Sequence, residues 1–152
     1  MTGAIIRNGT TDDIPAVVEM SFKFYAQTPY AAHVPLREDT AAGLALMTMR
    51  QDTLLVAEVD GAVVGMLSAF VDRFTFNPDY FIVNELAFWV NEEARGSSIA
   101  VKMVRAMRER CREKGVKFFS MAALSSSPEV AERLYKALGL SPIANVYMEV
   151  LQ

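Results

Sequence analysis

The sequence has very little of the chemistry that builds metal sites or disulfides. Its 152 residues include one cysteine, Cys111, and one histidine, His33. One cysteine excludes a disulfide within the chain, and one histidine cannot by itself supply a zinc site. We therefore expect no metal. The shortage of cysteine also favours a reducing, cytoplasmic location.

The sequence also lacks an excess of positive charge and a long hydrophobic run. Its formal net charge is −3 at pH 7, whereas partners rich in phosphate need a basic surface. No apolar run approaches the ~20 residues that span a bilayer, and no secretory signal is recognisable. We expect neither a nucleic acid nor a membrane as a partner. The length fits a single domain, residues 1–152, which can bury its own core.

What is present is an alternation of helical and strand patterns. Helices are predicted at 14–25, 39–49, 97–114 and 128–138, and strands at 4–7, 54–59, 62–71, 80–90, 116–122 and 145–151. Asp60-Gly61 predicts a two-residue hairpin between the second and third strands. The strand at 80–90 is apolar on both alternating sets, one with Ile82, Leu86, Phe88 and Val90 and the other with Phe81, Val83, Ala87 and Trp89. Such a strand is expected to be covered on both faces.

A polar turn follows this strand and opens into the helix at 97–114. Arg95 carries a fixed positive charge, Gly96 lets the backbone approach a ligand, and Ser97 and Ser98 offer small hydroxyl groups. The first N–H groups of a helix have no partner within it and, with the helix dipole, they bind anions such as phosphate. Gly-Ser-Ser is equally typical of an ordinary N-cap without a ligand. The turn alone leaves both interpretations open.

The helix after this turn is rich in basic residues and has one apolar stripe. The cations are Lys102, Arg105, Arg108, Arg110, Arg112 and Lys114, and we favour a solvated face over a second phosphate contact because Glu109 and Glu113 lie among them. Cys111 repeats with Ala100, Val104 and Met107 at helical spacing, which indicates a small core residue rather than a nucleophile.

Two segments resemble the GNAT superfamily of acyltransferases. Arg95 and Ala100 match the outer positions of its pyrophosphate-binding signature, while Ser98 stands where the family usually has glycine. Residues 131–140 are similar to its late helix, with Tyr135 on the helix and the sequence Leu-Gly-Leu at its end. Pro128 stands where the family usually has asparagine. The resemblance covers nearly the whole chain and implies an α/β (α+β) fold with a mixed central sheet of six to seven strands and helices on both faces.

The resemblance also implies an activity. GNAT enzymes transfer an acetyl group from acetyl-CoA to a primary amine in a ternary complex, so the acceptor is expected to be a small molecule or a peptide. Backbone groups of Phe88 and Val90 would hold the pantetheine arm of coenzyme A. The pyrophosphate would lie on Arg95, Gly96, Ser97, Ser98, Ile99 and Ala100. The departures at Ser98 and Pro128 leave an alternative, a non-catalytic module that binds acyl-CoA or a protein partner with the same fold. A dinucleotide oxidoreductase is disfavoured because no G-x-G-x-x-G occurs.

Two residues are candidates for catalysis. Glu85 is the only acidic residue in an otherwise apolar strand, so its pKa should rise toward the range where it accepts a proton from the amine, with Asn84 orienting a water. A buried Glu85 paired with a cation, or one that reaches water at the sheet edge, is the alternative. The resemblance implies that Tyr135 protonates the departing thiolate and that a main-chain N–H near Phe88 stabilises the oxyanion. Without the resemblance, Tyr135 would be taken as a core aromatic residue.

The acceptor region implied by the resemblance comprises residues 25–36 and 72–80. It is aromatic, with Tyr25, Tyr30, Phe74, Phe76 and Tyr80, and His33 is a second choice of base should Glu85 be misplaced. These aromatic residues are equally consistent with core cover or a dimer contact. An apolar content of 52% and the hydrophobic strand at 145–151 lead us to expect a homodimer.

Overall fold

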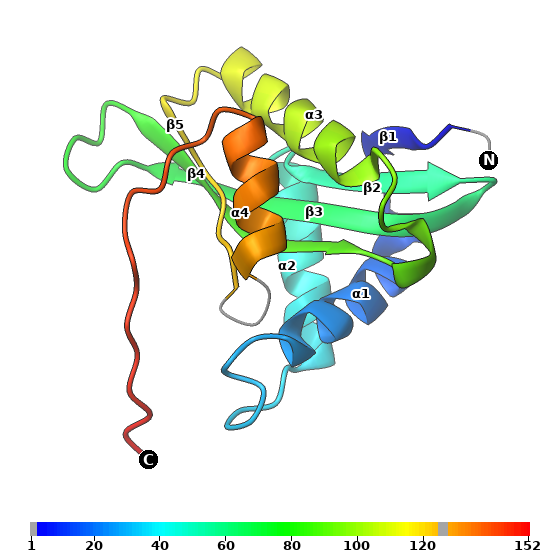
Figure 1. The fold of residues 1–152 in the computed structure, drawn as a ribbon, viewed down its shortest axis with the longest axis horizontal. Coiled ribbons are helices and arrows are strands. Elements are labelled where there is room, and N and C mark those ends of the chain that lie inside the picture. The colour runs from blue at the N-terminus through cyan, green and yellow to red at the C-terminus, as the bar shows by residue number, and fades with distance from the viewer. Residues whose placement is uncertain (1–2, 125–127) are drawn as a thin grey trace.

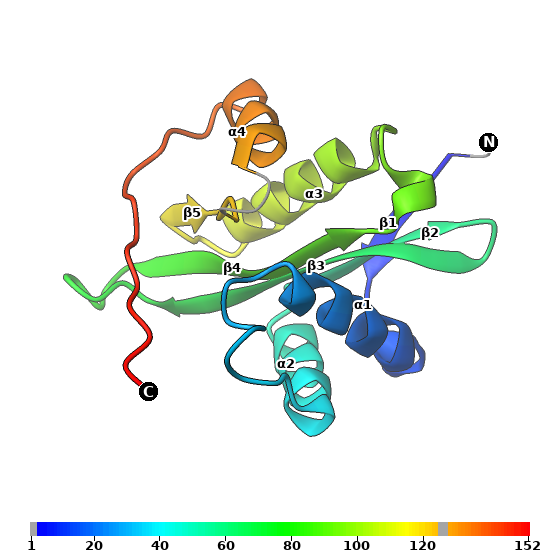
Figure 2. The same ribbon diagram turned by 60° about the horizontal axis from the view of Figure 1, so that its bottom comes forward.

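The computed structural model describes residues 3–124 and 128–152, and it consists of one sheet between two layers of helices. The strands lie in the order β1-β2-β3-β4-β5, with β5 parallel to β4 and the other neighbours antiparallel. Figure 2 shows α1 and α2 on one face of the sheet and α3 and α4 on the other. The elements are β1 Ile5–Asn8, α1 Ile14–Ala26, α2 Glu38–Arg50, β2 Leu54–Val59, β3 Ala62–Arg73, β4 Phe81–Val90, α3 Ile99–Glu113, β5 Phe118–Ser120 and α4 Pro128–Ala137.

The hairpin between β2 and β3 is confirmed. Asp60 and Gly61 have φ angles of 49° and 81°, so both central residues are in the left-handed region. A type I′ turn needs this geometry, and its twist matches that of the two flanking strands. The turn therefore fixes the pairing of β2 with β3, the middle strand of the sheet (Figure 1).

A β-bulge in β4 corrects the predicted alternation of this strand. Ser68 pairs with Ala87 but the next residue, Ala69, pairs with Glu85, so Leu86 is an extra residue on β4. An extra residue reverses which face the following side chains occupy. Val83 before the bulge packs in the core under α3, and after it Phe88 and Val90 pack there, while Ala87 and Trp89 pack toward α1 and α2. The prediction that β4 is covered on both faces is confirmed, but the assignment of its residues to faces was wrong.

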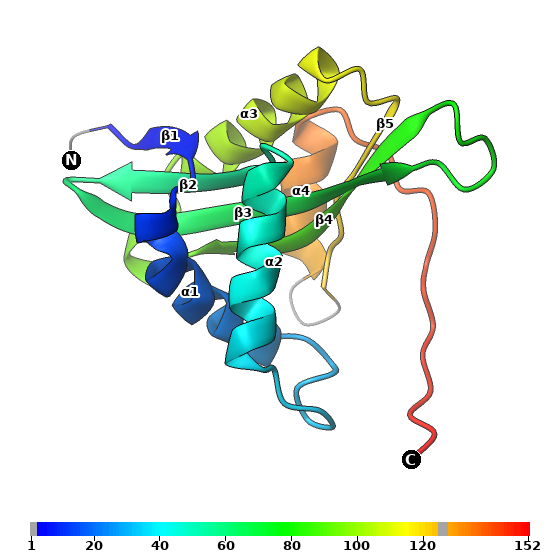
Figure 3. The ribbon, with the colours of Figure 1, turned by 180° about the vertical axis from the view of Figure 1, so that it is seen from behind.

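The sheet has five strands in the described residues, and the six to seven that we expected were too many. The predicted strand at 145–151 is not formed, because residues 141–152 have an extended path with no sheet partner and are exposed throughout. Figures 1 and 3 show this segment leaving the body of the molecule. Strand propensity alone does not form a strand, since its stability comes from pairing with a neighbour.

The helix α3 lies on the sheet through a continuous apolar stripe. Its buried residues are Ile99, Met103, Val104, Met107 and Cys111, so Cys111 is a core residue, as predicted. Burial raises the pKa of the Cys111 thiol to about 11, which leaves it protonated at neutral pH. Within the described ranges, no helix is both long and apolar enough to cross a bilayer.

Candidate functional site

The outer edge of β4 is divided into two halves. Its first half pairs with β5, through Ile82 with Phe118, Val83 with Phe119 and Asn84 with Ser120. Its second half, residues 85–90, continues to pair with β3 on the inner side as far as Val90, but it has no strand on its outer side in the described residues. The two parallel strands thus separate at Glu85. Apart from the carbonyl of Val90, which accepts a hydrogen bond from Arg95, backbone groups on the outer edge beyond this point have no strand partner in the described residues.

Glu85 and Tyr135 meet where the strands separate, although 50 residues lie between them. One carboxylate oxygen of Glu85, Oε2, accepts the backbone N–H of Ala122 at 2.7 Å and lies 3.5 Å from the hydroxyl of Tyr135. The same hydroxyl lies 2.9 Å from the carbonyl oxygen of Ala122 and donates its proton there. Ala122 follows β5 and Tyr135 is on α4, so three separate elements converge on this carboxylate.

The environment of this pair changes both pKa values. Burial raises the pKa of Glu85 to about 7, although the N–H of Ala122 and the hydroxyl of Tyr135 favour its ionised form. The pKa of Tyr135 is raised by burial and by the neighbouring carboxylate of Glu85. At neutral pH, Glu85 is therefore close to half ionised, whereas Tyr135 keeps its proton. A group that accepts a proton thus lies beside one that holds its proton.

The turn from β4 into α3 has the conformation that its sequence suggests. Gly96 has φ +77°, which requires glycine, and an added side chain there would meet no other atom within 4 Å. The Ser97 hydroxyl donates to the carbonyl of Ala94 at 2.6 Å and accepts only a long bond of 3.4 Å from the N–H of Ile99. Ser98 is the N-cap residue and is exposed, and its side chain makes no capping hydrogen bond. The start of α3 is therefore open, and Ile99 anchors it in the core.

Arg95 turns back toward β4. Its Nε donates to the carbonyl of Val90 at 2.8 Å, and its guanidinium lies 4.6 Å from the centre of the Trp89 ring. Stacking on an indole leaves the charge of the guanidinium intact and fixes its plane. The structure thus shows a contact that the sequence did not predict for this turn, the hydrogen bond from Arg95 to the carbonyl of Val90.

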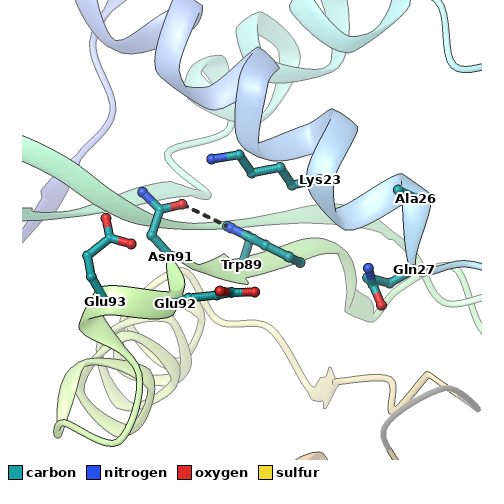
Figure 4. Close-up of a pocket in the computed structure, with 7 residues that line it drawn as sticks. All are labelled: Lys23, Ala26, Gln27, Trp89, Asn91, Glu92 and Glu93. Carbon is teal, nitrogen blue, oxygen red and sulfur yellow. Dashed lines mark hydrogen bonds between the residues drawn. The ribbon is translucent and has the colours of Figure 1, made fainter.

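A pocket of about 370 Å³ lies next to this arginine, on the α1 side of the sheet. It is lined by Lys23, Ala26 and Gln27 of α1 and by Trp89, Asn91, Glu92 and Glu93 at the end of β4 (Figure 4). The indole N–H of Trp89 donates to Oδ1 of Asn91 at 3.0 Å. Glu85 and Tyr135 lie on the α3 and α4 side of the sheet, so this pocket is separate from them.

The residues expected to bind the acceptor form two separate groups. Tyr25, whose hydroxyl donates to the carbonyl of Val34 at 2.6 Å, closes the loop between α1 and α2 that also carries Tyr30 and His33. Phe74 packs against Phe76 and Phe118 at the β3–β4 connection. Figures 1 and 3 show this loop and this connection at different ends of the molecule. The structure does not combine them into one aromatic surface.

Sequence reasoning missed several contacts of the site and its support. The bulge at Leu86 and the approach of Glu85 to Tyr135 depend on pairing between distant segments and leave no local signal. Arg108 and Arg110 were assigned to a solvated face, yet Arg108 donates to the carbonyl of Leu138 and Arg110 donates to the carbonyl of Asp52 at 2.8 Å. In the part of the chain that the structure describes, no group of three or more His, Cys, Asp or Glu residues is arranged to hold a metal ion.

In the described residues, the outer edge of β4 without a strand partner thus lies between a buried acid–tyrosine pair and the uncapped start of α3 in an α/β fold. A family model described as the acetyltransferase (GNAT) family matches residues 18–140. The chain belongs to this family, as the resemblance indicated.

Solved structures share the fold at low sequence identity. The aminoglycoside N-acetyltransferase AAC(6′)-Iy in complex with CoA has 14% identity and a TM-score of 0.77, and the match covers 97% of this chain and 94% of that one. A predicted acetyltransferase with acetyl-CoA from Clostridium acetobutylicum has 13% identity and a TM-score of 0.75, with 97% and 96% covered. A ribosomal-protein-alanine N-acetyltransferase from Brucella melitensis has 17% identity and a TM-score of 0.74, with 98% and 99% covered. A search among curated proteins found no match.

Proposed function

We propose that the protein is an acetyl-CoA-dependent N-acetyltransferase that acts on a primary amine of a small molecule or a peptide. One observation carries this proposal. The unpaired outer edge of β4 runs from the Glu85–Tyr135 pair to the open start of α3, so reactive groups lie at one end and an anion site at the other. That order corresponds to acetyl-CoA, which has a thioester at one end of an extended arm and a pyrophosphate at the other.

The residues present fit coenzyme A. The backbone of Phe88 and the N–H of Val90, whose carbonyl already accepts from Arg95, would bond the pantetheine arm. The turn from Arg95 to Ala100 would hold the pyrophosphate through Gly96, Ser97, Ser98 and Ile99. The absence of a capping bond from Ser98 leaves the first N–H groups of α3 for phosphate oxygens. When bound, acetyl-CoA supplies the activated acetyl group.

Glu85 and Tyr135 would handle the protons of the transfer. An alkylammonium acceptor carries three protons on nitrogen and the amide product keeps one. The first of these protons would go to solvent before the amine attacks the thioester. Glu85 takes the second as the C–N bond forms, and Tyr135 gives its own proton to the sulfur as the C–S bond breaks. The contact of 3.5 Å then lets Glu85 return a proton to Tyr135, and the enzyme recovers its starting state.

The bulge in β4 supports the proposed oxyanion site. The extra residue, Leu86, has no register partner on β3, and a bulge interrupts the regular ladder of backbone hydrogen bonds at such a residue. Leu86 lies two residues before Phe88, where the resemblance implies that a main-chain N–H stabilises the oxyanion. A backbone donor fixed in the sheet needs no reorganisation when negative charge develops.

Turnover with a panel of amines tests the proposal. The protein is incubated with acetyl-CoA and amines that include a polyamine, an aminoglycoside and an N-terminal alanine peptide, while free thiol is followed. Glu85→Gln and Tyr135→Phe should each lower kcat, whereas Glu129→Gln on the exposed side of α4 should not. Amine-dependent turnover that neither Glu85→Gln nor Tyr135→Phe reduces would refute the roles given to the two residues.

The alternative of a non-catalytic module is separated by calorimetry. Coenzyme A that binds without turnover for any amine would favour the module, in which Ser98 and Pro128 reflect lost catalysis. No binding of coenzyme A would exclude both the enzyme and a module that binds acyl-CoA, and would leave only the module that binds a protein partner. We also propose a cytoplasmic location, because a single cysteine favours a reducing compartment. Secretion of the tagged native protein would contradict that location.

A further inference from the structure

Trp89 is the only tryptophan of the chain, and its indole ring is fixed by a hydrogen bond and by packing. The indole N–H donates to Oδ1 of Asn91 at 3.0 Å, and Figure 4 shows this bond. The backbone N–H of Asn91 in turn donates to the carbonyl of Val64 on β3 at 2.8 Å, so Asn91 is itself held by the sheet. The ring also packs against the apolar cluster between the sheet and α1 and α2. Both the position and the orientation of the ring are therefore defined.

One face of this ring is covered by the guanidinium of Arg95, which lies 4.6 Å from the ring centre. Arg95 is exposed, and its Nε donates to the carbonyl of Val90 at 2.8 Å. An arginine side chain has five N–H groups, so four remain on the two terminal nitrogens. Among the described residues, these four have no hydrogen-bond partner and no carboxylate forms an ion pair with Arg95. The guanidinium is therefore fixed in place and still able to bind an anion.

The guanidinium lies where the outer edge of β4 ends and the turn into α3 begins. Val90, whose carbonyl it contacts, is the last residue of β4, and the turn leads from Arg95 through Gly96 to the uncapped Ser98. A guanidinium binds phosphate through two parallel hydrogen bonds, which need a defined plane. An exposed arginine with no contacts would lose side-chain freedom when it binds, whereas a stacked one has already lost it. Stacking on Trp89 thus prepares Arg95 for a phosphate group.

We propose that Trp89 is a positioning residue for coenzyme A, which sets the plane of Arg95 so that its terminal nitrogens bind the pyrophosphate. This inference rests on the proposed function and deepens it. The affinity for the cofactor then depends on a side chain that packs toward α1 and α2, on the face of the sheet opposite α3 and α4. Trp89 acts through Arg95 and not on the reacting groups, and Asn91 acts one step further away by holding the indole N–H.

A double-mutant cycle measured by calorimetry with coenzyme A tests this role. Trp89→Leu removes the stacking face and should weaken coenzyme A by about 3- to 10-fold, whereas Trp89→Phe keeps a ring and should recover most of that loss. In an Arg95→Ala background, Trp89→Leu should have no further effect, because the group that it positions is gone. Phe24→Leu is the matched control and should bind as the wild type does. Phe24 packs in the same cluster, and in the described residues no arginine stacks on its ring.

The fluorescence of Trp89 gives a second readout that needs no change in the core. Titration of the wild type with coenzyme A should change the emission with the midpoint found by calorimetry, while adenosine at equal absorbance should not. In Arg95→Ala, a change at an exposed site, the remaining binding should leave the emission unchanged.

Three results would overturn the role of Trp89 alone. They are wild-type affinity in Trp89→Leu, an equal effect of Trp89→Leu with and without Arg95, and an emission change that persists in Arg95→Ala. A wild type that binds no coenzyme A would instead refute the proposed function, and this inference with it.

Discussion

Replacing Glu85 with glutamine should make the fold more stable at alkaline pH while it slows the proposed reaction. Glutamine has the same size, and its amide oxygen can still accept the N–H of Ala122 that now lies 2.7 Å from the carboxylate. The change therefore removes a negative charge and keeps the packing. If the carboxylate of Glu85 lowers stability but is needed for catalysis, Glu85→Gln should raise the free energy of unfolding and lower kcat.

The magnitude follows from the pKa of Glu85, which burial raises from 4.5 to about 7. Below pH 4.5 the carboxyl group is protonated in both the folded and the unfolded chain, so it has no effect on the pH dependence. As the pH rises through 4.5 to about 7, the unfolded chain releases this proton while the folded chain retains it. The free energy of unfolding then falls by about 1.4 kcal/mol per pKa unit, which is up to about 3 kcal/mol above pH 7.

Urea unfolding at pH 5 and pH 8.5 measures this difference. Glu85→Gln and the wild type should have similar stability at the lower pH, and Glu85→Gln should be up to about 3 kcal/mol more stable at the higher pH. Glu129→Gln, at an exposed site on α4, should show no such divergence. A stability difference between Glu85→Gln and the wild type that is the same at both pH values would refute the reasoning, because the carboxylate would then cost nothing.

The same residue should shape the dependence of rate on pH. The value of kcat/KM for the wild type should rise as the pH passes an apparent pKa of about 7, since the ionised form of Glu85 accepts the proton. In Glu85→Gln this rise should disappear and the plateau should be lower by roughly 100-fold or more. A rise near pH 7 that persists in Glu85→Gln would mean that another group titrates.

Three further outcomes are expected. Tyr135→Phe should lower kcat by roughly 100-fold or more without changing the Kd of coenzyme A in calorimetry, and an unchanged kcat would exclude a role as general acid. Ser98→Glu should weaken coenzyme A by ~10-fold or more because it places a negative charge at the start of α3, while urea unfolding shows a stability gain of ~0.3–1 kcal/mol; unchanged affinity would move the pyrophosphate elsewhere. Asp13→Asn should cost about 2 kcal/mol in urea unfolding at pH 7, since the Arg7 guanidinium at 2.7 Å holds the pKa of Asp13 at about 2. That stability is present above pH 4 and is lost as the pH falls through about 2, so a deficit that persists at pH 2 would point to packing instead.

Local patterns predicted the parts of the fold that depend on a few neighbouring residues. The Asp60-Gly61 turn is read from one dipeptide, and both of its residues have the positive φ that it requires. Gly115 and Gly139, the glycines that follow α3 and α4, also have positive φ. At Gly139 the N–H of Leu140 also closes on the carbonyl of Tyr135 at 2.9 Å, as a glycine-terminated helix should. Such features are set by backbone sterics over four to six residues, which the sequence displays directly.

The features that were missed depend on how distant segments register. No local signal marks Leu86, between Glu85 and Ala87, as a bulge, and missing it reversed the predicted faces of the second half of β4. The site was predicted as two separate residues. The structure joins Glu85 and Tyr135 through Ala122, which follows β5 and was not considered. A contact of this kind appears only after the sheet and α4 have been assembled.

The strand predicted at 145–151 fails for a different reason from the bulge. Its alternation and composition are those of a strand, but composition alone does not place a partner strand beside it. In the structure Val146 and Tyr147 are about nine-tenths exposed, at 92% and 90%, while the outer edge of β5 has no strand beyond it in the described residues. Because the segment leads away from its own sheet, the local pattern gives the tendency of residues 145–151 to form a strand but not a neighbour for them to pair with, and a stable strand needs both.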